Sequence, residues 1–186
     1  MCIRDSTNTI ESVTTFQDNI SVREPENLGT KRVNGIELNG KISPSKKIVI
    51  SGDFNYNSFD RKAMWKGNSF DFKGDSWFSE FTSKFKLPKD FDIEFRWNYQ
   101  SGFKTIDGQS EPSQFLNLGA RKKHLKGKGV ISLNVRDLFV TRVSENLTIR
   151  NDFNVWTRSV YGRFWSLGFS YGFGKGEAME FRGRRR

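Results

Sequence analysis

The chain is short of three residue types, and each shortage narrows what the protein can be. Cys2 is its one cysteine and His124 its one histidine, so an internal disulfide is excluded and a metal site built on these residue types has little support. Alanine, the best helix former, occurs only at Ala63, Ala120 and Ala178, whereas there are 17 glycines and 18 phenylalanines. This composition predicts an all-β chain.

Long hydrophobic runs are also missing. No run approaches the roughly 18 consecutive apolar residues of a membrane-spanning helix, and the mean hydropathy is negative. Neither observation excludes a membrane β-barrel, because only alternate residues of its strands meet lipid. Residues 1–8 have neither the basic nor the apolar segment of a signal peptide, and we expect them to be a non-native or disordered start.

The clearest strand pattern lies in residues 162–175. Large apolar side chains occupy every second position there, and serine or glycine lies between them: Trp165, Leu167, Phe169, Tyr171 and Phe173. Successive side chains of a strand point to opposite faces, so one face of this strand is large and apolar. That face needs a cover, either a second protein layer or lipid.

The same alternation recurs along the chain and predicts about eight strands. The further strands are expected in residues 30–42, 47–59, 77–87, 91–100, 116–121 and 131–136, with a weaker one in 9–19. Tight turns are expected at residues 43–46, 88–90 and 122–128, and longer connections at 24–29, 60–74, 104–112 and 140–161, the last with a short hairpin in 147–156.

Short and long connections thus alternate, which is typical of an antiparallel up-and-down outer-membrane barrel with its turns on the periplasmic side. We expect residues 9–175 to form a partial, open and curved β-meander from such a barrel, and residues 176–186 to form a basic polar tail.

The expected strands have two chemically distinct faces. The candidates for the lumen-facing side are polar: Glu80, Asp92, Glu94, Arg96, Asn98, Arg121 and Arg136. The candidates for the lipid-facing side are apolar or aromatic: Trp77, Phe81, Phe85, Ile93, Phe95, Trp97, Leu116, Leu118, Ile131, Leu133, Val135, Trp165, Leu167, Phe169, Tyr171 and Phe173. We expect the charges to pair across neighbouring strands; lining a substrate path is the alternative.

A soluble β-sandwich or lipocalin-like barrel is the main structural alternative, because its core would also bury one apolar face. Three features favour lipid. The expected strands, of about 10 to 13 residues, are longer than those of most globular sheets and suit a tilted bilayer crossing. Charged side chains occupy mid-strand positions, and Trp77, Trp97, Tyr99 and Tyr171 lie towards strand ends, where aromatic girdles occur.

Several short motifs resemble TonB-dependent receptors, in particular the outer-membrane β-barrel family common in Bacteroidetes. The resemblance rests on Ser-Tyr-Gly-Phe-Gly-Lys at 170–175, Asn-Leu-Gly-Ala-Arg-Lys at 117–122, Leu-Lys-Gly-Lys-Gly at 125–129, Asp-Leu-Phe at 137–139, and Asn-Leu-Gly at 27–29 followed by Gly-Ile-Glu-Leu at 35–38. These motifs resemble the last strand, the preceding hairpin, the Asn/Asp-Leu-Phe signature and an upstream element of that family.

The resemblance implies a barrel of about 22 strands, closed by an N-terminal plug, that takes up large nutrients of the siderophore, cobalamin, glycan or peptide class. It implies the bacterial outer membrane as location. The implied partners are outer-membrane lipid, the missing N-terminal strands and plug of the same receptor, the barrel-assembly machinery, and, through the plug, an inner-membrane energy-coupling complex. This chain would be a C-terminal fragment. A complete eight-stranded barrel closed by residues 9–19, or a soluble β-sheet binding module, remain alternatives.

Other functional classes have less support. The net charge of +10 and the arginines at 182 and 184–186 invite a nucleic-acid interpretation, but no recognition module accompanies them. No catalytic arrangement is visible, and we expect a protein without enzymatic activity, cofactor or metal. The aromatic-rich segments 63–72 and 155–161 are candidates for an outer ligand site, because sugars and chelates stack on aromatic rings.

Overall fold

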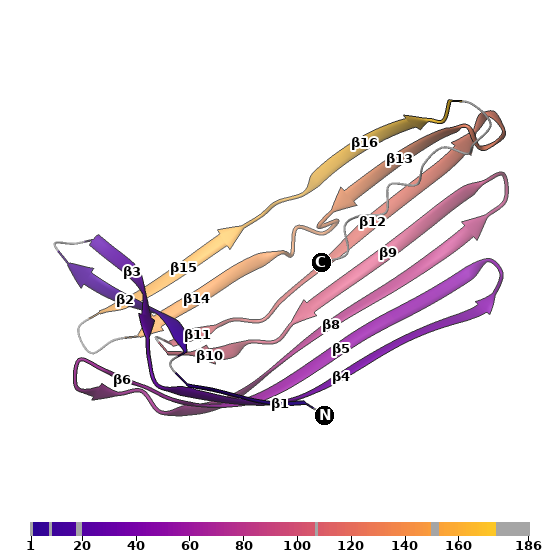
Figure 1. The fold of residues 1–186 in the computed structure, drawn as a ribbon. Helices are drawn as coiled ribbons and strands as arrows, with labels where there is room; N and C mark the ends of the chain where they lie inside the picture. The colour runs from indigo at the N-terminus through magenta and orange to yellow at the C-terminus, as the bar shows by residue number, and fades with distance from the viewer. Residues whose placement is uncertain (1, 8, 18–19, 107, 150–152, 174–186) are drawn as a thin grey trace.

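A large antiparallel sheet organises the molecule (Figure 1). The computed structural model describes residues 2–7, 9–17, 20–106, 108–149 and 153–173. The sheet has eight strands in the order β1-β4-β5-β8-β9-β12-β13-β16, and each strand pairs only with its neighbours in this order. Its strands are β1 (Cys2–Thr7), β4 (Thr30–Ser45), β5 (Ile48–Lys62), β8 (Phe72–Leu87), β9 (Phe91–Gln100), β12 (Ser113–His124), β13 (Gly129–Arg136) and β16 (Phe164–Tyr171).

The two ends of this sheet differ. Three tight connections, β4 to β5, β8 to β9 and β12 to β13, lie at one end, and the third contains a short 3-10 turn, Leu125–Gly127. The longer connections lie at the opposite end, which we call the loop end, and form small sheets of their own (Figure 1). These comprise β2 (Ile10–Gln17) with β3 (Ile20–Asn27), β6 (Met64–Trp65) with β7 (Asn68–Ser69), and β10 (Phe103–Thr105), β11 (Gly108–Ser110), β14 (Val143–Ile149) and β15 (Asn154–Val160).

The fold class and the alternation of short and long connections are therefore confirmed: the structure is all-β, antiparallel and open. Within the described residues, β1 and β16 form the two edges of the large sheet and do not pair with each other. A closed barrel in which residues 9–19 pair with the last strand is not what the structure shows, because β2 pairs with β3 in a separate sheet.

The strand register explains why alternating residues form continuous faces. Directly opposed residues of an antiparallel pair project to the same side. Phe81 opposes Trp97 and Phe95 opposes Leu118, while Leu133 opposes Leu167 two strands further on. One side of the sheet is thus an apolar face and the other a polar face. The register shifts once within the large sheet, between Ile42 and Ser45 of β4.

Few residues form an interior core, since a single layer leaves both faces open. Among the described residues, a small buried cluster of Val13, Leu28 and Ala63 joins the β2–β3 hairpin to the loop end of the sheet, with Phe70 and Ile106 packed against it. None of the described residues belongs to a helix long and apolar enough to cross a membrane.

Three expectations about the first 29 residues need correction. Of the non-native or disordered start expected in residues 1–8, disorder is wrong for Cys2–Thr7, which forms β1 and pairs with residues 30–35 of β4, and a non-native origin stays a prediction. The weak strand in 9–19 exists as Ile10–Gln17, but it lies outside the large sheet. The loop at 24–29 is wrong up to Asn27, because β3 extends through it in register with β2.

Other boundaries shift because backbone pairing continues beyond the amphipathic segments. The turn expected at 43–46 falls after Ser45, and β5 and β8 continue into the connection expected at 60–74. The hairpin expected in 147–156 is longer and comprises β14 and β15. The final strand ends at Tyr171, and the tail at 176–186 lies outside the described residues.

Candidate functional site

Charged side chains on the polar face pair with one another across and along the strands. The Arg96 guanidinium lies 3.8 Å from Glu80 of the neighbouring strand and 3.3 Å from Glu94 of its own strand. Arg121 of β12 lies 2.5 Å from Asp92, the residue directly opposite on β9. The structure thus brings together five of the seven polar candidates as ion-paired groups.

The other two polar candidates lie apart from these pairs. Arg136 places its guanidinium 5.8 Å from the ring centroid of Phe164 on β16, at the loop end of β13. Asn98 lies between Glu80 and Phe115 in the strand register and is only 8% exposed. Its Nδ2 has no hydrogen-bond partner among the described residues.

A groove runs along the polar face at the loop end of β4, β5 and β8. Its volume is about 840 Å³, and it continues into a second hollow of about 470 Å³ that shares Glu37, Asn55, Asn57, Ser76 and Gln100. The lining is rich in amide and hydroxyl groups, with aromatic rings at Phe59, Phe78 and Phe103. Such a surface offers both hydrogen-bond donors and acceptors and flat apolar faces to a ligand.

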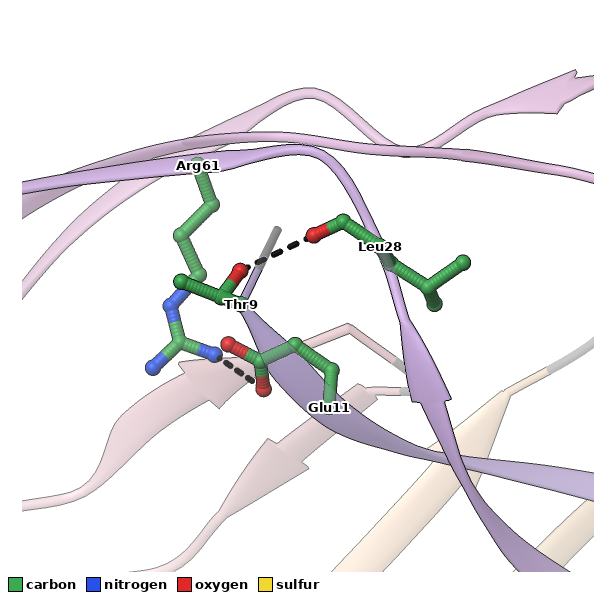
Figure 2. Close-up of polar contacts among 4 residues, drawn as sticks. All are labelled: Thr9, Glu11, Leu28 and Arg61. Carbon is green, nitrogen blue, oxygen red and sulfur yellow. Dashed lines mark hydrogen bonds and ion pairs between the residues drawn. The ribbon is translucent and has the colours of Figure 1, made fainter. Parts of the chain in front are cut away.

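The β2–β3 hairpin forms one wall of this groove, and an ion pair fixes it there. Figure 2 shows Arg61 of β5 reaching towards Glu11 of β2, with Nη1 2.9 Å from the carboxylate oxygen. Both side chains are only 18% exposed. The guanidinium also lies 5.2 Å from the ring centroid of Phe59 and 5.6 Å from that of Phe72. A cation held between rings and a carboxylate is a well-defined anchor.

Two hydrogen bonds close the base of this hairpin. Thr9 Oγ1 donates to the Leu28 carbonyl at 2.9 Å (Figure 2). The Leu28 backbone N–H donates to the Thr9 carbonyl at 2.8 Å. They join the beginning of β2 to the end of β3. Gly29 follows with a φ of +57°, and a Cβ there would lie 1.7 Å from the Lys62 carbonyl oxygen, so only glycine fits where the hairpin returns to the sheet.

A second polar anchor lies in the loop after β13. The Asp137 side chain is 1% exposed, and its carboxylate accepts hydrogen bonds from the backbone N–H groups of Thr141 and Arg142 at 2.8 and 3.0 Å. The Asp137 N–H donates to Asn117 Oδ1 at 3.0 Å. Arg142 then lies 4.8 Å from the centroid of Phe115 and 4.5 Å from that of Tyr161. The Asp-Leu-Phe motif therefore begins a tightly bonded loop.

The apolar face carries its largest rings towards the loop end of β8 and β9. Trp77 and Tyr99 stack with centroids 4.3 Å apart, and Phe54 and Trp97 lie beside them. All sixteen expected lipid-facing residues but Phe173 fall on this face by strand register; Phe173 follows the end of β16. Val135 is an exception in exposure, at 2%, because the larger Leu118 and Trp165 flank it on both sides.

The comparison with protein families decides what this sheet is. The family model of the outer membrane protein beta-barrel family matches residues 2–171, nearly the whole chain. The chain belongs to the outer membrane protein beta-barrel family. Membership gives the bacterial outer membrane as its location. Searches of curated proteins and of solved structures found no match.

For this outer membrane barrel protein, sequence reasoning missed the groove and its anchor. Asn55, Asn57, Phe59 and Arg61 alternate along β5 and share the polar face, so extending the strand expected in 47–59 by two residues would have placed Arg61 beside the other three. Glu11 carried no such signal, because its role depends on the pairing of β2 with β3. Among the described residues, no group of three or more His, Cys, Asp or Glu is placed to hold a metal ion.

Proposed function

We propose that the chain is the C-terminal part of a TonB-dependent receptor-like barrel that carries large nutrients across the outer membrane. The observation that carries this proposal is that the eight-stranded sheet has open edges. Within the described residues, its two edge strands, β1 and β16, do not pair with each other. Lipid cannot satisfy the backbone N–H and C=O groups of a strand edge, so a wall of this kind needs further strands to close it.

The two faces fit a barrel wall in this proposal. The apolar face meets lipid, with the Trp77 and Tyr99 stack near the outer membrane surface, and the polar face lines the lumen. The tight turns then lie on the periplasmic side and the small sheets on the outer side. On this face Arg96 pairs with Glu80 and Glu94, and Arg121 pairs with Asp92, so most of the charge on the proposed lumenal wall is balanced.

The groove under the β2–β3 hairpin is the proposed ligand path. Its amide groups and aromatic rings suit a glycan or peptide, and a siderophore or cobalamin would use the same rings. The segments 63–72 and 155–161 belong to the same outer end of the sheet, where Trp156 and Tyr161 are exposed. The role is binding and passage, without enzymatic chemistry or a cofactor.

The proposed partners follow from the open edges. Further N-terminal strands and a plug of the same receptor complete the barrel, and the plug connects it to the inner-membrane energy-coupling complex. The aromatic residues at the end of β16, Tyr171 and Phe173, form an edge-to-face pair with centroids 5.0 Å apart. They are the proposed contact for the barrel-assembly machinery.

The DNA upstream of the Met1 codon tests the proposal. We expect the reading frame to continue upstream into alternating strands, a plug and an export signal. An in-frame stop codon followed directly by a complete export signal and the strands of this chain would contradict it. Deleting the energy-coupling complex should then abolish uptake through the complete receptor, whereas a passive barrel would be unaffected.

A further inference from the structure

The end of the sheet that carries the three tight turns is strongly basic. Residues 45–48, 86–92 and 121–130 contain eight lysines and one arginine but only two aspartates, and Asp92 is paired with Arg121. The lysines of this rim, which we call the lysine rim, are Lys46, Lys47, Lys86, Lys89, Lys122, Lys123, Lys126 and Lys128. The loop end, in contrast, mixes acidic and basic residues on every connection.

Backbone hydrogen bonds join the three turns into one continuous rim. Lys86 N–H donates to the Lys47 carbonyl at 2.7 Å, and Lys123 N–H donates to the Asp90 carbonyl at 3.0 Å. The Lys122 ammonium donates to the Lys89 carbonyl at 2.7 Å. The charges are therefore held side by side across strands rather than distributed on independent loops.

Turn geometry does not explain the lysines. Lys89 and Lys126 adopt φ values of +62° and +55°, in the left-handed region that glycine, asparagine and aspartate occupy more readily. Six of the eight lysines of the rim are exposed: Lys46, Lys47, Lys86, Lys89, Lys126 and Lys128. Their ammonium groups are therefore accessible to water or to an external partner.

The apolar face ends where the lysine rim begins. Ile48 opposes Phe85, Leu87 opposes Phe91, and Ile131 opposes Phe169, so apolar side chains continue to the last residues before each turn. This arrangement matches a bilayer with anionic lipids: the apolar band lies against the acyl chains, and the row of ammonium groups lies at the depth of the headgroups. Charge complementarity selects anionic over zwitterionic lipid.

We propose that the lysine rim binds the anionic phospholipid headgroups of the leaflet that borders the tight-turn end of the wall. The inference rests on the proposed function in that it takes the apolar face as lipid-facing. Each lysine near an anionic surface contributes about a fivefold gain in partitioning, so several together make the preference measurable.

Vesicle sedimentation of the 186-residue chain tests this. Partitioning is measured into phosphatidylcholine vesicles with and without about a third phosphatidylglycerol, a fraction that gives a strongly negative surface. A rim variant carries K46Q, K47Q, K126Q and K128Q. A matched loop-end variant carries K62Q, K66Q, K73Q and K104Q, with the same change in net charge and with all four positions exposed.

We expect the anionic lipid to raise partitioning of the unmodified chain, and the rim variant to lose roughly tenfold or more of that gain. The loop-end variant should keep the gain within about twofold. Equal losses in both variants would show non-specific attraction of a cationic chain and overturn the proposal. A gain that survives in the rim variant would also overturn it, as would a gain that inorganic phosphate removes at matched ionic strength.

Protease protection of the strands separates this result from the proposed function. A chain that inserts equally well into both kinds of vesicle and in both variants remains a barrel wall but has no headgroup site. A chain that binds anionic vesicles through the rim while its strands stay open to protease retains the headgroup site and contradicts the membrane wall.

Discussion

Arg61 of β5 and Glu11 of β2 form the ion pair that holds the β2–β3 hairpin over the polar face, with 2.9 Å between Nη1 and the carboxylate oxygen. Fifty residues separate them in the sequence, and both are mostly withdrawn from water. Removing one member of such a pair leaves the other partly buried without its counter-charge.

Arg61→Met should therefore loosen the hairpin without unfolding the sheet. We expect amide hydrogen exchange in β2 and β3 to accelerate roughly tenfold, equivalent to about 1.4 kcal/mol of local stability. Lys73→Met is the control, because the Lys73–Asp60 pair joins an ammonium that is 80% exposed and such pairs contribute little. Equal acceleration in both variants would contradict a specific anchor.

Asp137 should be the most sensitive polar position of the chain. Asp137→Ala leaves the backbone N–H groups of Thr141 and Arg142 without their acceptor and should destabilise the folded sheet by about 2 to 4 kcal/mol in urea unfolding. Asp137→Gly relieves the φ of +53° but also lacks the carboxylate. If glycine restores stability where alanine does not, the backbone conformation at residue 137, and not the hydrogen bonds of its carboxylate, accounts for the loss in Asp137→Ala.

The directly opposed pair of Asp92 and Arg121 allows a charge-swap experiment. Asp92→Arg places two cations opposite each other. It should lower the free energy of unfolding of the lipid-embedded chain by about 1 kcal/mol. Adding Arg121→Asp restores an opposite-charge pair in the same register and should recover most of the loss. A double variant no more stable than the single one would show that the two groups do not interact.

Leu133 and Asn134 are adjacent on β13 but project to opposite faces. Leu133→Arg should reduce folding stability in lipid by about 2 to 4 kcal/mol, because an arginine on a lipid face must leave the hydrocarbon region or carry its charge into it. Asn134→Arg adds the same side chain to the polar face and should change stability by less than about 1 kcal/mol. Equal costs would mean that both faces meet the same medium.

The large sheet was predictable because its middle is amphipathic. Where one face is apolar, a period of two is visible in the sequence and fixes both strand and register, as in Phe91–Gln100. The antiparallel order followed from the alternation of short and long connections, whereas the open edges were expected from the resemblance to a larger barrel. These features depend on the order of apolar and polar side chains, which can be read directly from the sequence.

The parts that escaped prediction are held by backbone pairing and by distant contacts. Cys2–Thr7 has a single large apolar residue in its sequence, Ile3, so no apolar repeat predicts the strand that pairs with β4. The β2–β3 hairpin is placed by Val13, Leu28 and the Glu11–Arg61 pair, which no local pattern connects. Polar extensions of β5 and β8 likewise continue a ladder without an apolar repeat.

The most direct test of the central claim, that the apolar face of this sheet meets lipid, is a fluorescence-quenching comparison at two neighbouring positions of β13. In a Cys2→Ser background, Leu133→Cys and Asn134→Cys each carry the same fluorophore in the chain reconstituted into vesicles. We predict that lipids brominated on their acyl chains quench the label at position 133 and that aqueous iodide quenches the label at 134. Equal quenching at the two positions, or no quenching by brominated lipid at 133, would contradict the account.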